Sequence, residues 1–485
     1  MRISGYISSS ISAFVLALAA VSCSFSDVTA EGVLSAEADI YPDYRNVTVP
    51  CNIAPLNFNY VGESCDAAVL DIAGIGQVKA SRDGLFKFSA KTWKRICSDG
   101  GAQLTVLVKN DGKWMAHPSF RVEVSNDPID PYVAYRLIPP GYQGWKSMGI
   151  YQRDLTSYRQ SAIFDNSLTN ESCMNCHSFA DRNPEKMVFH MRGQNGGTYL
   201  IDGEKIEKLN TKTPQTISAL VYPQWHPGGR YIAFSVNDTF QVFHSTDRNR
   251  IEVYDTCSDV VLYDTERHEI MSSPLLMTEE RFETYPSFSP DGKTLYFCSS
   301  PAREMPNEYK EVQYSICSIG FDPDSGRFGE TVDTLYQHGS AVFPRLSPDG
   351  HFLMFTESGY GCFPIWHKDA DIKMIDLRDG AIFEMAELNS ADVDSYHSWS
   401  SSSRWVIFSS RREDGLYTRL YISHIDESGN CAKPFMLPQK DPDFSKGFFK
   451  SFNIPEFTAG KVIAQEKDIA DRAVNDKGTD IRWKD

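Results

Sequence analysis

Two cysteines and a histidine lie close together in the segment Cys173-Met174-Asn175-Cys176-His177. Two thiols at this spacing, followed directly by an imidazole, form the CxxCH pattern by which c-type haem is attached. In a helical segment the two thiols lie on one turn, where each can form a thioether with a haem vinyl group, and the imidazole can ligate the iron. The pattern therefore predicts one covalent haem c held by Cys173, Cys176 and His177.

Other chemistry of a cysteine pair is less well supported. A thioredoxin-like redox pair should precede a helix in a βαβ pattern, and none is visible. Half of a zinc site would need a second pair of ligands at suitable spacing, which is also missing. A structural disulfide between Cys173 and Cys176 stays open as an alternative.

The second ligand of the iron should come from residues that follow the motif. Met187, His190 and Met191 are near in sequence. If they lie on a strand, Met187 and Met191 share one face and His190 takes the other. His190 and Met191 are the predicted candidates, since either residue type makes a low-spin electron-transfer centre. His397 is a lesser candidate that we expect to line a pocket.

The first residues have the features of an export signal. Arg2 is followed by an apolar run from Ile11 to Val21, which is too short to span a membrane. Ala20-Val21-Ser22-Cys23 resembles a bacterial lipobox, with Ala in place of the usual Leu. The resemblance implies a signal peptide over 1–22, lipidation of Cys23, and an exported bacterial lipoprotein in the outer membrane, facing the periplasm or the surface. Cleavage without lipidation, before Cys23 or after Ala30, is the alternative.

Charge and cysteine content limit the possible partners. The formal net charge is −16, which disfavours nucleic acid because its phosphates require a basic surface. The chain has 11 cysteines, and an oxidising compartment would permit disulfides among those outside Cys23 and the CxxCH motif. Cys298 and Cys317 lie in consecutive apolar runs, where they could pair or could be inert core thiols.

The region before the motif is predicted to hold a small β domain. Residues 31–128 carry short alternating runs separated by turn residues such as Asn110-Asp111-Gly112, which is typical of an immunoglobulin-like β-sandwich. Two prolines, Pro128 and Pro131, then disfavour helix at the residues before them. We interpret residues 129–181 as a connector that bears the haem motif.

The last three hundred residues contain a repeat. Its common feature is an aromatic residue, a Ser-Pro-Asp-Gly type of turn and an alternating apolar strand. Three copies are plain and begin at Tyr222, Tyr285 and Phe343, a fourth begins at Tyr396, and a fainter one begins at Phe449. These copies resemble the PD40 repeat of TolB-like propellers. The resemblance implies an all-β chain whose residues 182–485 form a six-bladed TolB-like β-propeller, after the sandwich and the haem-bearing connector.

The haem motif itself aligns with the repeat. Cys176-His177-Ser178-Phe179 corresponds to Tyr396-His397-Ser398-Trp399 and to Phe449-Lys450-Ser451-Phe452. The motif therefore supplies the start of a sixth copy. Because such segments gather at one rim of a propeller, we expect the haem at that rim, with Trp225 and Trp399 as neighbours.

The predicted function is electron transfer or redox sensing, with the propeller as a docking surface for a protein partner and a lipid anchor as the link to the membrane. One haem carries one electron, and we find no second cofactor motif. Two alternatives remain: a scaffold that binds proteins or glycans and has no redox role, and a haem enzyme of peroxidase type.

Overall fold

The computed structural model describes residues 27–484, so the predicted signal peptide over 1–22 and the lipidation site Cys23 lie outside the described residues. The fold is all-β, with two short α-helices, α1 (Ala90–Ser98) and α2 (Glu466–Asn475). Among the described residues, no helix is long and apolar enough to cross a membrane.

The N-terminal unit consists of two sheets and helix α1. The larger sheet contains β1 (Gly32–Val33), β3 (Val47–Pro50), β5 (Ala67–Ile72), β6 (Gly76–Lys79), β8 (Gly101–Asn110), β9 (Lys113–Ala116) and β10 (Phe120–Ser125); the smaller contains β2 (Ile40–Tyr41), β4 (Phe58–Tyr60) and β7 (Leu85–Phe86). The pairs β1–β9 and β3–β10 are parallel. Helix α1 begins after Ser89, whose hydroxyl accepts a hydrogen bond from the Thr92 backbone. The immunoglobulin-like assignment stays a prediction.

Six further sheets are antiparallel among the four strands that form the body of each. They contain β34 (Ser451–Thr458), β11 (Tyr132–Ile138), β12 (Gly149–Asp154) and β13 (Gln160–Asp165); β14 (Cys173–Phe179), β15 (Lys186–Arg192), β16 (Gly197–Asp202) and β17 (Lys205–Asn210); β18 (Val221–Trp225), β19 (Tyr231–Phe243), β20 (Ile251–Asp264) and β21 (Glu269–Met271); β22 (Arg281–Phe288), β23 (Thr294–Pro301), β24 (Ser315–Asp322) and β25 (Arg327–Tyr336); β26 (Ser340–Leu346), β27 (Phe352–Ser358), β28 (Asp371–Asp376) and β29 (Ile382–Phe383); β30 (Asp394–Trp399), β31 (Trp405–Ser410), β32 (Arg419–His424) and β33 (Phe435–Met436).

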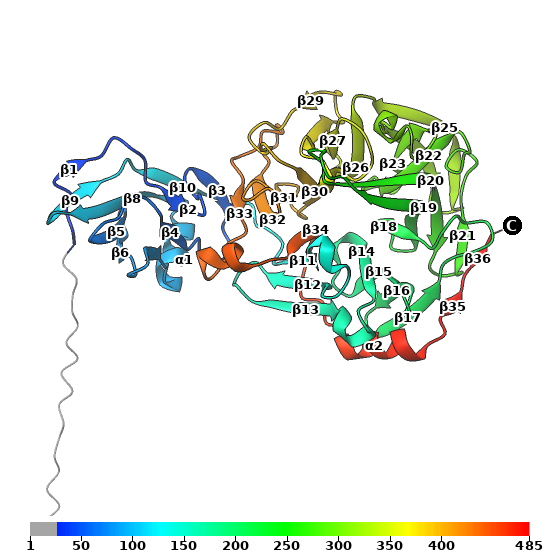
Figure 1. Ribbon diagram of the computed structural model, residues 1–485, viewed down its shortest axis with the longest axis horizontal. Helices are drawn as coiled ribbons and strands as arrows, with labels where there is room; N and C mark the ends of the chain where they lie inside the picture. Colours follow the sequence, from blue (N-terminus) through cyan, green and yellow to red (C-terminus); the bar gives the residue numbers. More distant parts are fainter. Residues whose placement is uncertain (1–26, 485) are drawn as a thin grey trace, which may run out of the picture.

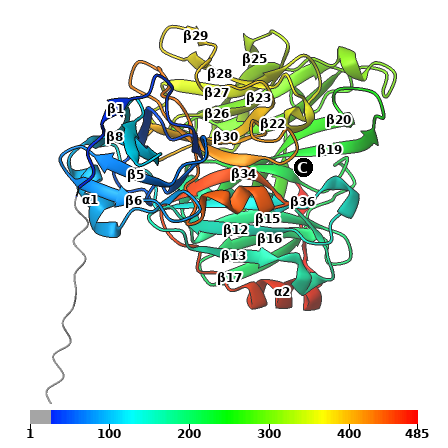
Figure 2. The ribbon, with the colours of Figure 1, turned by 60° about the vertical axis from the view of Figure 1, so that its left-hand side comes forward.

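These six sheets form a closed ring, which makes the fold propeller-like (Figure 1). The first strand of each sheet, which we call the inner strand, is β34, β14, β18, β22, β26 or β30. Each inner strand contacts the inner strands of the two neighbouring sheets, and β34 contacts both β14 and β30. The N-terminal unit lies at one side of the ring (Figure 2) and shares a hydrophobic core with it that includes Trp405 and Phe457.

Both ends of the ring's chain meet in one sheet. The sequence predicts a connector over 129–181, but these residues contain β11, β12 and β13, and β11 pairs with β34 near the C-terminus. The connector prediction is therefore wrong for this segment. The repeat pattern could not show it, because this sheet is assembled from two distant parts of the chain. The short strands β35 (Thr479–Asp480) and β36 (Arg482–Trp483) then pair with β17 and β21.

Each inner strand contains the same local distortion. One residue has a positive φ, and a register shift relative to a partner strand occurs next to it; these residues are Cys176 (φ 47), Tyr222 (52), Tyr285 (50), Phe343 (57), Tyr396 (52) and Ile454 (48). A bulge of this kind bends the strand and re-aims the side chains that follow it. The alignment of Cys176 with Tyr396 is thus correct, but the C-terminal copy is centred on Ile454 rather than on Phe449.

The position of the C-terminal copy, at Ile454 rather than at Phe449, can be tested with two phenylalanines of this segment. Phe457 is fully buried, whereas Phe449 is 64% exposed. Phe457→Ala should lower the free energy of unfolding by about 3–5 kcal/mol, since it leaves a cavity in the shared core. Phe449→Ala should change it by less than about 0.5 kcal/mol. Chemical denaturation of both variants measures the two effects, and equal effects would contradict the register described here.

Candidate functional site

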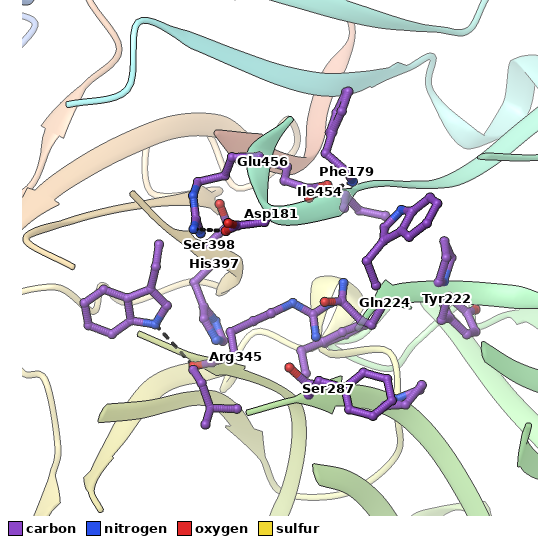
Figure 3. Close-up of a pocket in the computed structure, with 18 of the residues that line it drawn as sticks. Phe179, Asp181, Tyr222, Gln224, Ser287, Arg345, His397, Ser398, Ile454 and Glu456 are labelled. Carbon is purple, nitrogen blue, oxygen red and sulfur yellow. Dashed lines mark hydrogen bonds and ion pairs between the residues drawn. The ribbon is translucent and has the colours of Figure 1, made fainter. Parts of the chain in front are cut away.

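The inner strands enclose a cavity of about 320 Å³. Residues from all six inner strands line it, and Figure 3 shows Arg345, His397 and Glu456 around the same space. The volume is at the lower end of the range for ligand pockets. Because the bulge recurs in every inner strand, side chains at equivalent positions of six sheets reach one site.

The positive-φ residues form one part of the cavity lining. Four of them are aromatic and contact one another in order around the ring: the ring centroids are 4.7 Å apart for Tyr222 and Tyr285, 4.0 Å for Tyr285 and Phe343, and 4.6 Å for Phe343 and Tyr396. Cys176 and Ile454 occupy the same position in the remaining two strands. We call the set of six positive-φ residues the aromatic ring, after its four aromatic members. It gives the cavity an apolar wall in which one thiol is embedded.

The CxxCH motif lies on a strand and not on a helical turn. Residues Cys173–Phe179 form β14, which pairs with β15, so the helical expectation is wrong. The motif begins an inner strand of the ring, and pairing with β15 determines its backbone. Cys176 and His177 line the cavity, whereas Cys173 is buried outside its lining. All ten cysteines from Cys51 to Cys431 in the described chain are free, including Cys298 and Cys317.

His177 is buried and its ring is not engaged. Its exposed fraction is 3%, and neither ring nitrogen has a hydrogen-bond partner among the described residues. Burial, assisted by the positive charge of Arg136, lowers the pKa of His177 to about 3. The imidazole is therefore neutral at physiological pH. A buried polar group without a partner is costly, and in a cavity it indicates a position that a ligand can satisfy.

His397 is a second imidazole of the same kind. It lines the cavity, is 3% exposed, and has no side-chain hydrogen-bond partner for either ring nitrogen among residues 27–484. Burial lowers its pKa to about 3, and the carbonyl groups of Phe343 and Met354 act in the opposite direction. The expectation that His397 lines a pocket is confirmed.

The predicted second iron ligands lie elsewhere. Met187 and Met191 are fully buried in a core that also contains Phe164 and Tyr199. His190 is 5% exposed, and its Nδ1 is 3.1 Å from the Thr198 hydroxyl. None of the three lines the cavity with His177. They lie on β15, the second strand of its sheet, whose side chains pack within and between sheets instead of facing the centre of the ring.

Four charged residues of the cavity were not among the predicted site residues: Asp181, Arg182, Arg345 and Glu456. Arg345 and Glu456 each stand two positions after the positive-φ residue of their strand. The Glu456 carboxylate accepts a hydrogen bond of 2.9 Å from the Phe179 backbone. Burial raises the pKa of Glu456 to about 7, against the lowering effects of that hydrogen bond, Arg345 and Arg182. The same position holds Ser178, Gln224, Ser287 and Ser398 in the other copies, so a polar residue recurring there was the available signal.

Trp225 and Trp399 also line the cavity, as expected from the repeat. Each indole nitrogen donates to a backbone carbonyl of the preceding inner strand: Trp225 to Ser178 and Trp399 to Arg345, both at 3.2 Å. These bonds connect strands of different sheets, which share no ladder hydrogen bonds. The tryptophans therefore hold the rim of the cavity together as well as lining it.

The shifted pKa of Glu456 predicts a dependence of stability on pH. A carboxyl whose pKa rises from 4.5 in the unfolded chain to about 7 in the folded protein destabilises the fold progressively as pH rises through that interval. Glu456→Gln removes this contribution. Its free energy of unfolding relative to the wild type should therefore increase from about pH 4.5 to pH 7 and level off above that range, as measured by denaturation at several pH values. A difference that does not vary with pH would contradict the shift.

Neither a protein-family model nor a curated protein matches this chain. Among solved structures, it is similar to an oligogalacturonate lyase in complex with manganese, at 12% identity and TM-score 0.27 over 60% of this chain and 57% of that one. It is also similar to a putative dipeptidyl aminopeptidase IV from Bacteroides ovatus, at 11% identity and TM-score 0.25 over 65% and 60%. A third similarity is to a mannose phosphorylase from Leishmania mexicana in complex with phosphate, at 9% identity and TM-score 0.17 over 87% and 91%. The chain spans less than two thirds of the length of the first two. We assign none of these activities to it.

Proposed function

We propose that this protein is an exported c-type cytochrome-like lipoprotein in which a six-bladed TolB-like propeller holds one haem c at the mouth of its central cavity. The observation that carries the proposal is the position of Cys176 and His177. Both belong to a CxxCH motif and both line the cavity at the centre of the ring. The unpartnered ring nitrogens of His177 support a role for this side chain as a ligand.

The blade count rests on the ring of sheets. Six sheets with at least four strands each follow one another in cyclic contact, and the sheet that closes the ring combines β34 with β11. Closure of a propeller by a sheet that combines its first and last strands in sequence protects the edges that would otherwise be left unpaired. The recurring positive-φ residue supports the assignment of each sheet as one copy of the repeat.

The residues present fit a haem at Cys176 and His177, and Cys173 sets one requirement. A free thiol and an unpartnered imidazole meet at the cavity. Cys173 is also free, but it pairs with Arg192 in β14–β15 and lies outside the cavity lining. Bonding of both thiols to one porphyrin therefore requires residues 173–175 to leave this pairing.

A bound haem would supply one-electron transfer at the centre of the ring. Cys173 and Cys176 would hold it covalently, and His177 would donate a ring nitrogen to the iron. The aromatic ring would keep water from part of the site, which tends to raise a reduction potential. Arg345, whose guanidinium donates to the Pro344 carbonyl, offers a positive charge at the cavity to a carboxylate.

The remaining parts of the proposal concern location and partners. A lipid on Cys23 would attach the protein to the outer membrane, facing the periplasm or the surface. The ring would serve as the docking surface for a redox or scaffold protein. The acidic charge of −16 favours a basic partner and disfavours nucleic acid.

Covalent haem is the direct test. The wild-type protein, exported in a host with a c-type maturation system, should carry haem that remains attached on a denaturing gel and after acid-acetone extraction. Cys176→Ala should abolish stable attachment or reduce it at least about tenfold, and Cys173→Ala should weaken it, because each removes one thioether. Cys317→Ala is the matched control, since Cys317 is a buried free thiol of the same ring outside the motif.

The control should retain the full amount of haem. A correctly exported, folded wild type without covalent haem would reject the proposal. That result would favour the alternative of a propeller scaffold that binds proteins or glycans.

A further inference from the structure

Two imidazoles line one cavity in this protein. Among the cavity-lining residues in the part of the chain that the structure describes, His177 and His397 are the only histidines, and no methionine is present. Imidazole and thioether are the common neutral side-chain ligands of haem iron. If the proposed haem is present, its second iron ligand should be one of the side chains that line the cavity with His177.

His177 and His397 occupy equivalent positions in the repeat. Each directly follows the positive-φ residue of its inner strand, Cys176 or Tyr396. In the other four inner strands this position is proline: Pro223, Pro286, Pro344 and Pro455. Proline has no N–H and a fixed φ, which suits an inner strand next to a bulge. The two copies that depart from proline both have histidine.

The two strands that carry these histidines are placed symmetrically about the closing strand. β14 and β30 both contact β34, one on each side. His177 and His397 therefore reach the cavity from either side of the strand that supplies Glu456. Figure 3 shows His397 near Arg345 at the cavity, on the side of the site formed by β26 and β30.

The burial and the position of His397 suit an iron ligand. It is 3% exposed and lines the cavity, and neither ring nitrogen has a side-chain hydrogen-bond partner among residues 27–484. The backbone carbonyls of Phe343 and Met354 are the polar groups of the chain that act on it. His190, by contrast, has a side-chain partner in the Thr198 hydroxyl and does not line the cavity. A neutral imidazole in a cavity has a lone pair available for a metal ion.

We propose that His397 is the second protein ligand of the haem iron, together with His177. The predicted candidates Met191 and His190 are set aside, because Met191 belongs to a packed core and His190 is hydrogen-bonded to Thr198. Ligation uses one ring-nitrogen lone pair of each histidine and involves no change in charge or oxidation state. The haem centre is then a bis-histidine centre with no ligand position left open for peroxide, which favours electron transfer over peroxidase chemistry.

The experiment compares absorption spectra of the full-length, haem-matured protein in the oxidised and reduced states. The wild type should be low-spin in both states. His397→Ala and His397→Gln should become high-spin in at least about half of the molecules, and added imidazole should restore the low-spin spectrum of His397→Ala. His397→Met should shift the midpoint potential to a more positive value, as replacement of imidazole by thioether does.

Two controls separate ligation from structural damage. His190→Gln and Met191→Leu alter the other candidates while keeping similar volume, and both should remain low-spin. Covalent haem on a denaturing gel and circular dichroism should be unchanged in His397→Gln, which shows that the fold and the attachment persist.

Three results would overturn the inference. One is a low-spin spectrum in His397→Ala and His397→Gln, another is loss of the low-spin state in Met191→Leu or His190→Gln alone, and the third is a high-spin wild type. Each of these leaves the proposed covalent haem intact, because attachment is read from the gel and not from the spectrum. Absence of covalent haem from the wild type would instead overturn both proposals.

Discussion

The left-handed backbone conformation in the inner strands is the constraint on which the site depends. A non-glycine residue at positive φ costs of the order of 1 kcal/mol, and here it occurs once in each of the six inner strands. Packing between neighbouring inner strands and the contacts of the aromatic ring offset this cost. Without the bulge, strict alternation would turn the residue after Cys176 toward the opposite face of the strand. The cavity and the position of His177 therefore follow from the same distortion.

The fold could be predicted from the sequence where one copy of the repeat is continuous. Copies that begin at Tyr222, Tyr285 and Phe343 contain an aromatic residue, a turn and an apolar strand within a short segment, so local turn chemistry and alternation suffice. The closing sheet could not be recognised in this way, because the pairing of β11 with β34 joins residues more than three hundred positions apart. The faint similarity at Phe449 was misleading for a related reason, since Ile454 is not aromatic and the register depends on its backbone.

The site was predicted in part for similar reasons. His177 and Cys176 were identified from the spacing of reactive residues. Met191 and His190 were selected because they are close to the motif in sequence. In this ring, however, consecutive strands of one sheet lie at increasing distance from the centre, so the strand after the motif does not reach the cavity. Arg345 and Glu456 were missed because each is an isolated charge in its own copy. They become a pair only when the ring brings two inner strands to one cavity, where each influences the pKa of the other.

The closing sheet joins β11 to the distant strand β34, and this affects the order in which the protein can mature. Until residues 451–458 have emerged, β14 has no β34 beside it. Cys176 and His177, which are 6% and 3% exposed in the closed ring, then face an open edge. During synthesis from the N-terminus, this interval is the period in which an enzyme or a bulky group can reach them. Closure by β34 ends it, so the speed of C-terminal folding sets a time limit on any chemistry performed on these two side chains.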